Sequence, residues 1–141
     1  MPTSNPILQE LLEDFAASGD VQDTNRLIQF FGAKECTVLL PVRVPDKSMV
    51  QPPEFATAMD PQLGPVVHVY TMVGELPRQQ GGVAVINCTV LDLMGDLLLG
   101  QDVGVVFDPH TAHAVYFRFN GPQWVVRTVH SMRAEKRIGL N

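Results

Sequence analysis

Apolar positions in the first 32 residues recur with the period of an α-helix. The apolar side chains of the first predicted helix fall on one face: Ile7, Leu8, Leu11, Leu12 and Phe15. Asn5 followed by Pro6 is typical of a helix start, and Gly19 stands where this helix would end. A second helix is predicted from Asp23 or Thr24 to Gly32, with its own apolar stripe. We expect both stripes to pack on the protein's own core rather than in the groove of a partner.

Two apolar, β-branched segments follow the helices. The first, residues 36–44, predicts a strand in which Pro41 favours an edge or interrupted position. The second, residues 66–70, places His68 and Tyr70 on one face of a strand and two valines on the other.

Residues 45–65 carry five prolines and show neither the strand period nor the helix period, so the pattern predicts a long surface loop. Phe55, Met59 and Leu63 within it either anchor the loop to the core or form an exposed apolar contact surface.

The alternation of elements in residues 83–107 predicts a βαβ unit with parallel strands at 83–87 and 103–107. Thr89 followed by Asp92 is typical of a helix start, so the crossover helix is expected over residues 89–99. This helix is apolar almost all round, including Leu97 and Leu98, which predicts a central position or a dimer interface.

The remaining strands are expected to be antiparallel, because the turns DPHTAH and NGPQ that separate them are short. Residues 130–141 carry several basic side chains and predict a solvated tail or a short helix. The chain is therefore expected to be one domain of the α/β (α+β) class, residues 1–141. It would contain a helical start over 1–32 and a mixed sheet over 36–129 with one crossover and carboxy-terminal antiparallel hairpins.

Composition narrows the range of partners. The chain has 141 residues, 45% of them hydrophobic, which suits a single core. Its net charge of −5 argues against nucleic acid and anionic membrane surfaces as partners, and no apolar run reaches the ~20 residues of a membrane span. Cys36 and Cys88 lie in apolar segments and are interpreted as reduced core thiols of a cytoplasmic protein.

Four residues are candidates for a binding site because they follow the predicted parallel strands: Thr71, Asn87, Asp108 and His110. Ligands of open α/β sheets bind at the carboxyl ends of parallel strands. Asp108, His110 and His113 are also of the right types for a metal or acid–base site. The sequence favours the simpler interpretation, in which Asp108 and Pro109 begin a turn.

Cys88 is a further candidate, as a nucleophile working with His68 or His110, because a helix start can lower the pKa of a thiol. Its apolar neighbours favour a buried thiol instead. The sequence lacks the glycine-rich phosphate loop, the CxxC pair and the GxSxG motif, and we expect no cofactor and no metal.

The order of several short motifs resembles the amino-terminal domain of the SseB family, named for enhanced serine sensitivity. These are NPILQELLEDF, CTVLLPV, HVYTMVGEL, AVINCTVLDLM and GVVFDP, which together cover about residues 5–109. Asp108 stands where that family usually has asparagine, and residues 45–65 match it poorly. The resemblance implies a mixed α/β interaction module without an established reaction or catalytic residues, found in bacteria and sometimes linked to secretion gene clusters.

These observations leave three functional hypotheses. The leading one is a non-enzymatic protein-interaction or adaptor domain of the SseB-like type, forming a homodimer or binding another protein. The second is a small metal-dependent or cysteine hydrolase that uses Asp108, His110 and His113. The third is an acidic, chaperone-like dimer that holds a segment of a secreted partner.

Overall fold

A computed structural model of the protein describes residues 3–43, 54–55, 57–77, 83–97, 103–120 and 123–137. The helical elements are α1 (Pro6–Ser18), α2 (Val21–Phe31), the short η1 (Val73–Glu75), α3 (Val90–Asp92) continued by the π-helical turn η2 (Leu93–Leu97), and α4 (Val129–Arg137). The strands are β1 (Thr37–Arg43), β2 (Glu54–Phe55), β3 (Thr57–Asp60), β4 (Gly64–Val69), β5 (Val83–Thr89), β6 (Gly104–Phe107), β7 (Val115–Asn120) and β8 (Gln123–Thr128).

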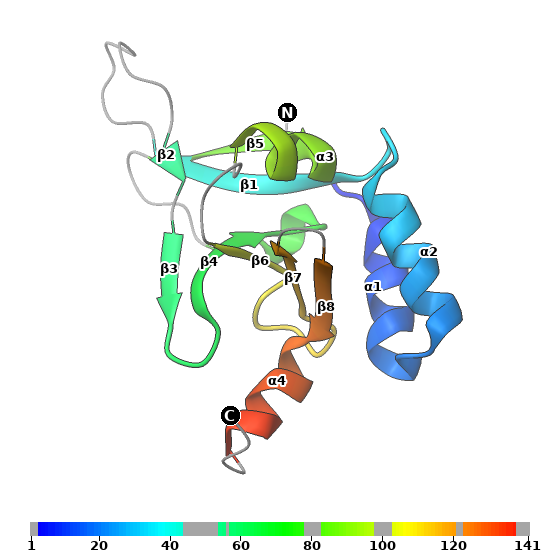
Figure 1. Ribbon diagram of the computed structural model, residues 1–141. Helices are drawn as coiled ribbons and strands as arrows, with labels where there is room; N and C mark the ends of the chain where they lie inside the picture. The colour runs from blue at the N-terminus through cyan, green and yellow to red at the C-terminus, as the bar shows by residue number, and fades with distance from the viewer. Residues whose placement is uncertain are drawn as a thin grey trace, which may run out of the picture.

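The described strands form two sheets, one with the order β2-β1-β5 and one with the order β3-β4-β6-β7-β8. The five-stranded sheet is mixed, because β4 and β6 are parallel while its other neighbouring pairs are antiparallel. A bridge between Leu39 and Tyr70 joins the two sheets. The expected α+β class with a mixed sheet, amino-terminal helices and carboxy-terminal antiparallel strands is confirmed (Figure 1).

The parallel pair involves a different strand from the one expected. The segment 83–87 does not pair with 103–107, because β5 is antiparallel to β1 along its whole length, from Thr37↔Thr89 to Arg43↔Val83. The parallel partner of β6 is β4, with Val69 opposite Phe107. The crossover from β4 to β6 therefore contains both β5 and α3. An apolar run indicates that a strand is buried, but it does not specify which neighbour the strand pairs with.

The caps of the first two helices explain where they begin. Asn5 accepts a hydrogen bond from the Leu8 amide at 3.2 Å, and its own amide group donates to the Glu35 and Thr37 carbonyls at 2.9 and 3.1 Å. The cap of α1 thus also holds the start of β1. α2 begins two residues before the expected Asp23, because the Asp20 carboxylate accepts a hydrogen bond from the Asp23 amide at 2.8 Å.

The main core lies between one face of the five-stranded sheet and the layer formed by α1, α2, β1 and α3 (Figure 1). Phe31 of α2 lies at its centre, with its ring 5.2 Å from that of Phe107 and 4.8 Å from that of Phe117. The expectation that the helix stripes pack on the protein's own core is confirmed except at Ile7, which is 60% exposed.

Within the part of the crossover helix that the structure describes, one side is covered and the other is exposed. Val90 and Leu93 are buried, whereas the side chain of Leu91 is 54% exposed. Leu97 closes the π-helical turn, but its side chain and all of Leu98 lie outside the described residues, so the interface expected there stays a prediction.

The opposite face of the five-stranded sheet carries a smaller apolar cluster: Leu63, Val66, Val106, Ala114, Tyr116 and Val129. α4, which the sequence left open as a tail or helix, extends from β8 below this sheet (Figure 1). We call this side of the sheet the pocketed face, after the pocket described below.

The expected loop over residues 45–65 is wrong at three places. Residues 54–55 form β2 and pair with β1, residues 57–60 form β3 and pair with β4, and β4 itself begins at Gly64. Met59 of β3 is 74% exposed, so it does not anchor this segment, whereas Leu63 is buried in the smaller apolar cluster and does. The side chain of Phe55 lies outside the described residues, and its predicted contact is untested. Pro41 lies opposite Val85 of β5, and within the described residues the ladder on its other side is interrupted at this position, because β2 pairs only with Val42 and Arg43. Leu39, two residues earlier, donates its backbone N–H to the Tyr70 carbonyl, on the side of β1 away from β5. Because backbone N–H groups alternate between the two sides of a strand, the nitrogen of Pro41 also faces away from β5.

Candidate functional site

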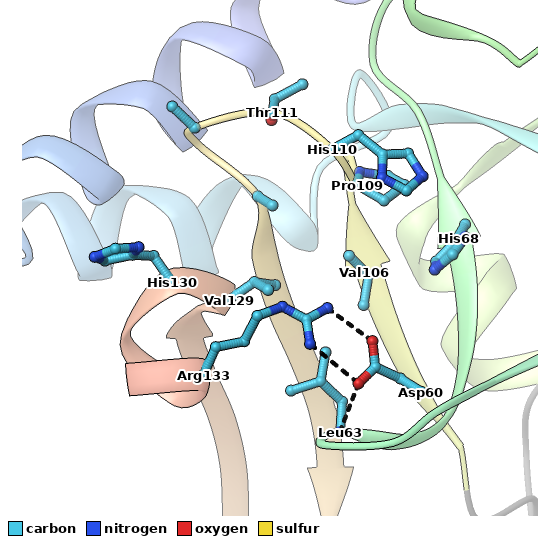
Figure 2. A pocket seen from close by; sticks show the side chains of 12 residues that line it. Asp60, Leu63, His68, Val106, Pro109, His110, Thr111, Val129, His130 and Arg133 are labelled. Carbon is cyan, nitrogen blue, oxygen red and sulfur yellow. Dashed lines mark hydrogen bonds and ion pairs between the residues drawn. The ribbon is translucent and has the colours of Figure 1, made fainter. Parts of the chain in front are cut away.

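A pocket of about 560 Å³ opens on the pocketed face. Its walls come from β3 and the turn after it, from β4 and β6, from the loop between β6 and β7, and from the first turns of α4 (Figure 2). The lining side chains are Asp60, Leu63, His68, Val106, Pro109, His110, Thr111, Ala112, Ala114, Val129, His130 and Arg133. A volume of this size is typical of sites for small ligands or for a few residues of a peptide.

An ion pair between Arg133 and Asp60 closes one side of the pocket. The guanidinium donates to both carboxylate oxygens, at 2.7 and 3.2 Å (Figure 2). It also donates to the Gln62 side-chain oxygen at 2.6 Å. The hydrogen bond from Arg133 lowers the pKa of Asp60 to about 2, and the same contact raises the pKa of Arg133. Asp60 is thus ionised at neutral pH, and Arg133 neutralises its charge.

His68 and His110 meet across another part of the pocket. Their ring centroids are 6.2 Å apart and their planes are inclined by 75° (Figure 2). Burial lowers the pKa of His68, and the charge that His110 can carry lowers it further. His110 reaches this position because its backbone is left-handed, with φ of +73°. We call these two residues the histidine pair.

A third histidine stands at the other side of the pocket. His130 is the second residue of α4, and Figure 2 shows its ring well apart from the histidine pair. Three of the four histidines of the chain therefore line one pocket. The amide of Val129 donates to the Ala114 carbonyl at 2.9 Å, which holds the start of α4 against this part of the sheet.

Asp108 belongs to a different cluster, which we call the Asp108 cluster: Asp108, Thr71 and His113. The carboxylate is fully buried and accepts hydrogen bonds from the Thr71 amide at 2.8 Å and the Thr71 hydroxyl at 2.6 Å. The Nε2 atom of His113 lies 2.9 Å from the same carboxylate. Asp108 has φ of +50°, a conformation that aspartate and asparagine adopt more readily than most residues.

The predicted set of Asp108, His110 and His113 is divided between two sides of the sheet end. His113 bonds to Asp108 and lines a second hollow with Glu13, Ala16 and Ala17 of α1, whereas His110 faces the pocket. Within the described residues, no three histidine, cysteine, aspartate or glutamate side chains are grouped so that they could hold a metal ion.

Of the four predicted binding residues, the structure brings Thr71 and Asp108 together and turns His110 toward the pocket. Asn87 is elsewhere, because β5 belongs to the other sheet, and its side-chain oxygen accepts a hydrogen bond from the Thr3 amide at 3.2 Å. Asn87 was expected near the other three residues only because segments 83–87 and 103–107 were predicted to be parallel, and the structure does not contain this arrangement.

The two cysteines are poor nucleophiles at neutral pH. Burial raises the pKa of Cys36 to about 12. Burial, together with the nearby Asp92 charge, raises the pKa of Cys88 to about 11. The lowering that a helix start can produce is absent at Cys88, where α3 is only three residues long.

Sequence reasoning missed Asp60, His130 and Arg133 as site residues. Asp60 lies in the segment expected to be a loop, and Arg133 in the segment expected to be solvated. The two are 73 residues apart, and no local pattern indicates that their side chains meet. The three histidines, although scattered, were the signal that could have indicated a shared site.

No described helix is long and apolar enough to cross a membrane. In comparisons with known proteins, no family model, no curated protein and no solved structure matches the chain.

Proposed function

We propose that the protein is a non-enzymatic adaptor, of the SseB-like type that its motifs resemble, and that it binds a segment of another protein on the pocketed face. The observation that carries the proposal is the difference between the two faces of the five-stranded sheet. One face packs against helices and β1, whereas the other opens into a pocket of about 560 Å³. A sheet face that keeps an open, partly apolar pocket is suited to receiving a ligand.

The state of Asp108 supports binding rather than hydrolysis. Its carboxylate accepts two hydrogen bonds from Thr71 and contacts His113, so it holds the end of β6 against the end of β4. A general base needs a substrate within hydrogen-bond reach, but Asp108 is fully buried. His110, which faces the pocket, belongs to a different cluster from Asp108.

A second copy of the chain is an alternative to a different protein as the partner of this adaptor. Several large apolar side chains are exposed on separate elements: Ile7 of α1, Val21 of α2, Met59 of β3 and Leu91 of α3. A homodimer of the kind expected from the sequence would cover some of them. The experiment below therefore separates a second copy of the chain from a different protein.

The test is site-specific photo-crosslinking in the cells from which the protein comes. A benzoylphenylalanine replaces Ala112, an exposed residue at the pocket, and in the control variant it replaces Gln29, an exposed residue of α2. We expect discrete adducts from position 112 and none from position 29, and mass spectrometry of the adducts identifies a partner or a second copy. Equal labelling from both positions, or none from position 112, would contradict the proposal.

A second experiment tests the hydrolase alternative. The purified protein is assayed with generic ester, phosphoester and peptide substrates, with and without Zn²⁺, beside Asp108→Asn and His110→Asn. The adaptor proposal expects no turnover that depends on either residue. Turnover lost in both variants would favour the hydrolase instead.

A further inference from the structure

We propose that the pocket binds a carboxylate carried on a short apolar group, with the carboxylate held between His68 and His110 and the apolar group on the sheet. The inference names the ligand chemistry of the pocketed face, and it rests on the proposed function in placing the binding site there. A free branched-chain acid and the carboxy-terminal end of a protein chain share this chemistry.

The histidine pair supplies the polar end of the site. Neither imidazole has a hydrogen-bond partner within the residues that the structure describes, and neither is fully buried. By contrast, His113 in the next turn of the same loop bonds to Asp108 at 2.9 Å. Two imidazoles 6.2 Å apart at the wall of a pocket can each donate an N–H to a shared acceptor.

The charges around the pocket favour an anion over a cation. Asp60 is the only acidic residue among the described lining side chains, and both of its oxygens already accept hydrogen bonds from Arg133. The remaining polar lining includes three histidines, which are neutral or positive but never negative. The first turn of α4 also lines the pocket with Val129 and His130, and the amino-terminal end of a helix carries partial positive charge.

The apolar lining accounts for the other half of the ligand. Leu63, Val106, Ala114 and Val129 line the pocket and belong to the apolar cluster of this face. Their side chains give a hydrocarbon group of leucine size a surface to bury. The volume of about 560 Å³ exceeds what a bare inorganic anion or a carboxylate alone would fill.

Binding should depend on pH. The pKa of His68 is lowered by burial and by its neighbour His110, so the free pocket resists carrying two protons. A carboxylate between the rings stabilises their protonated forms, and it stays ionised itself above about pH 5.5. Affinity is therefore expected to rise as the pH falls from 8 to 6, and binding is expected to raise the pKa of His68. Arg133 stays paired throughout this range, because the pKa of Asp60 is about 2.

The experiment follows the imidazole ¹H–¹³C NMR signals of the whole protein during titration with N-acetyl-L-leucine. N-acetyl-L-leucinamide, which has the same shape without the charge, is the matched control ligand. We expect the acid to bind about tenfold more tightly than the amide at pH 6, and to move the His68 and His110 signals more than the His113 signal. Equal affinity for acid and amide, or no shift of either pair member, would overturn the inference.

Variants locate the contact. His68→Gln and His110→Asn are each expected to weaken binding of N-acetyl-L-leucine about fivefold to tenfold, because each removes one donor to a charged acceptor. Asparagine suits position 110, where φ is +73°. The control is Arg26→Gln, which removes an exposed cationic side chain of α2 outside the pocket and is expected to change affinity less than twofold. Equal losses in all three variants would contradict a carboxylate held by the pair.

A parallel titration with 4-methylpentanoate distinguishes the two sources of the carboxylate, a free branched-chain acid and the carboxy-terminal end of a protein chain. Tighter binding of N-acetyl-L-leucine identifies the end of a protein chain, and tighter binding of 4-methylpentanoate identifies a free acid. Both results support carboxylate recognition. Failure of this inference is separable from failure of the adaptor proposal, because adducts from position 112 without preference for acid over amide would leave the adaptor standing and remove the carboxylate.

Discussion

The loop between β6 and β7 supplies histidines to two clusters that differ in one decisive respect. In the Asp108 cluster, His113 bonds to a buried carboxylate that also accepts two hydrogen bonds from Thr71. In the histidine pair, His110 faces His68 across a pocket, and neither ring has a hydrogen-bond partner among the described residues. Buried polar groups are normally satisfied, so the first cluster is what a structural site requires. Donors left available at an open pocket are what a binding site requires.

One short loop contributes residues both to the buried Asp108 cluster and to the histidine pair at the pocket. Asp108 and His110 both have positive φ, at +50° and +73°. Each left-handed residue redirects the chain, and the loop passes from the buried strand end to the open face within two residues. Pro109 between them is buried. The Asp108 cluster therefore holds the ends of β4 and β6 together and, through the same loop, fixes the position of His110 at the pocket wall.

The largest expected effect comes from removing the buried carboxylate. Asp108→Ala is expected to lower the free energy of unfolding by about 4 kcal/mol, because it leaves the Thr71 amide, the Thr71 hydroxyl and His113 without their acceptor and puts alanine at positive φ. Asp108→Asn keeps one acceptor oxygen and is expected to cost about 1–2 kcal/mol. Urea unfolding monitored by circular dichroism measures both. A loss below 1 kcal/mol in the alanine variant would show that the cluster is not structural.

Thr71→Val is the next change, because it removes one donor and keeps the shape. Asp108 would retain the Thr71 amide at 2.8 Å and His113 at 2.9 Å but lose the hydroxyl at 2.6 Å. We expect a cost of about 1.5 kcal/mol in urea unfolding. Thr24→Val is the control, since its hydroxyl donates to the Asp20 carbonyl at an exposed position and its loss should cost less than about 0.5 kcal/mol. Equal costs for the two variants would contradict the special role of the cluster.

Arg133→Gln tests the ion pair beside the histidine pair through its pH dependence. The folded-state pKa of Asp60 is lowered to about 2, so ionised Asp60 stabilises the fold above about pH 4 and this contribution is lost as the pH falls toward 2. The variant is expected to be about 1 kcal/mol less stable than the wild type at pH 7. This difference should shrink steadily below pH 4.

Urea midpoints measured between pH 2.5 and pH 7 check this expectation. The control is Arg26→Gln, whose exposed ion pair with Asp23 spans 3.7 Å and should contribute little at any pH. A difference between wild type and Arg133→Gln that does not change with pH would show that the contact with Asp60 is not the cause.

The smallest expected effect on stability is that of His110→Asn, because this side chain is exposed and asparagine tolerates positive φ. The free energy of unfolding should change by less than about 0.5 kcal/mol. The pKa of His68 should nevertheless move upward, because the repulsion from a protonated His110 contributes to its lowering. An NMR pH titration of His68 in both proteins measures this, and an unchanged pKa would show that the two rings do not interact.

Local chemistry was enough to predict most of the elements. The Asn5–Pro6 start and the Gly19 end of α1, the Thr89 cap of α3 and the short turns before β7 and β8 all act through residues within a few positions of one another. Asp108 as the end of a strand and the beginning of a turn was predicted for the same reason. The SseB resemblance rests on these same short motifs and stays a prediction.

The site depended on pairings that no local pattern contains. The run 83–87 is as apolar as a central parallel strand, yet it pairs antiparallel with β1, and β6 takes β4 as its parallel neighbour. That choice brings His68 beside His110, separates Asn87 from Asp108, and carries Arg133 across 73 residues to Asp60. The sequence by itself determined most of the helices, strands and turns, although not β2 and β3, because hydrogen bonds and caps within a few residues decide them. Only the tertiary structure decided which polar side chains are satisfied and which remain available, because that depends on side chains that folding brings together from distant positions.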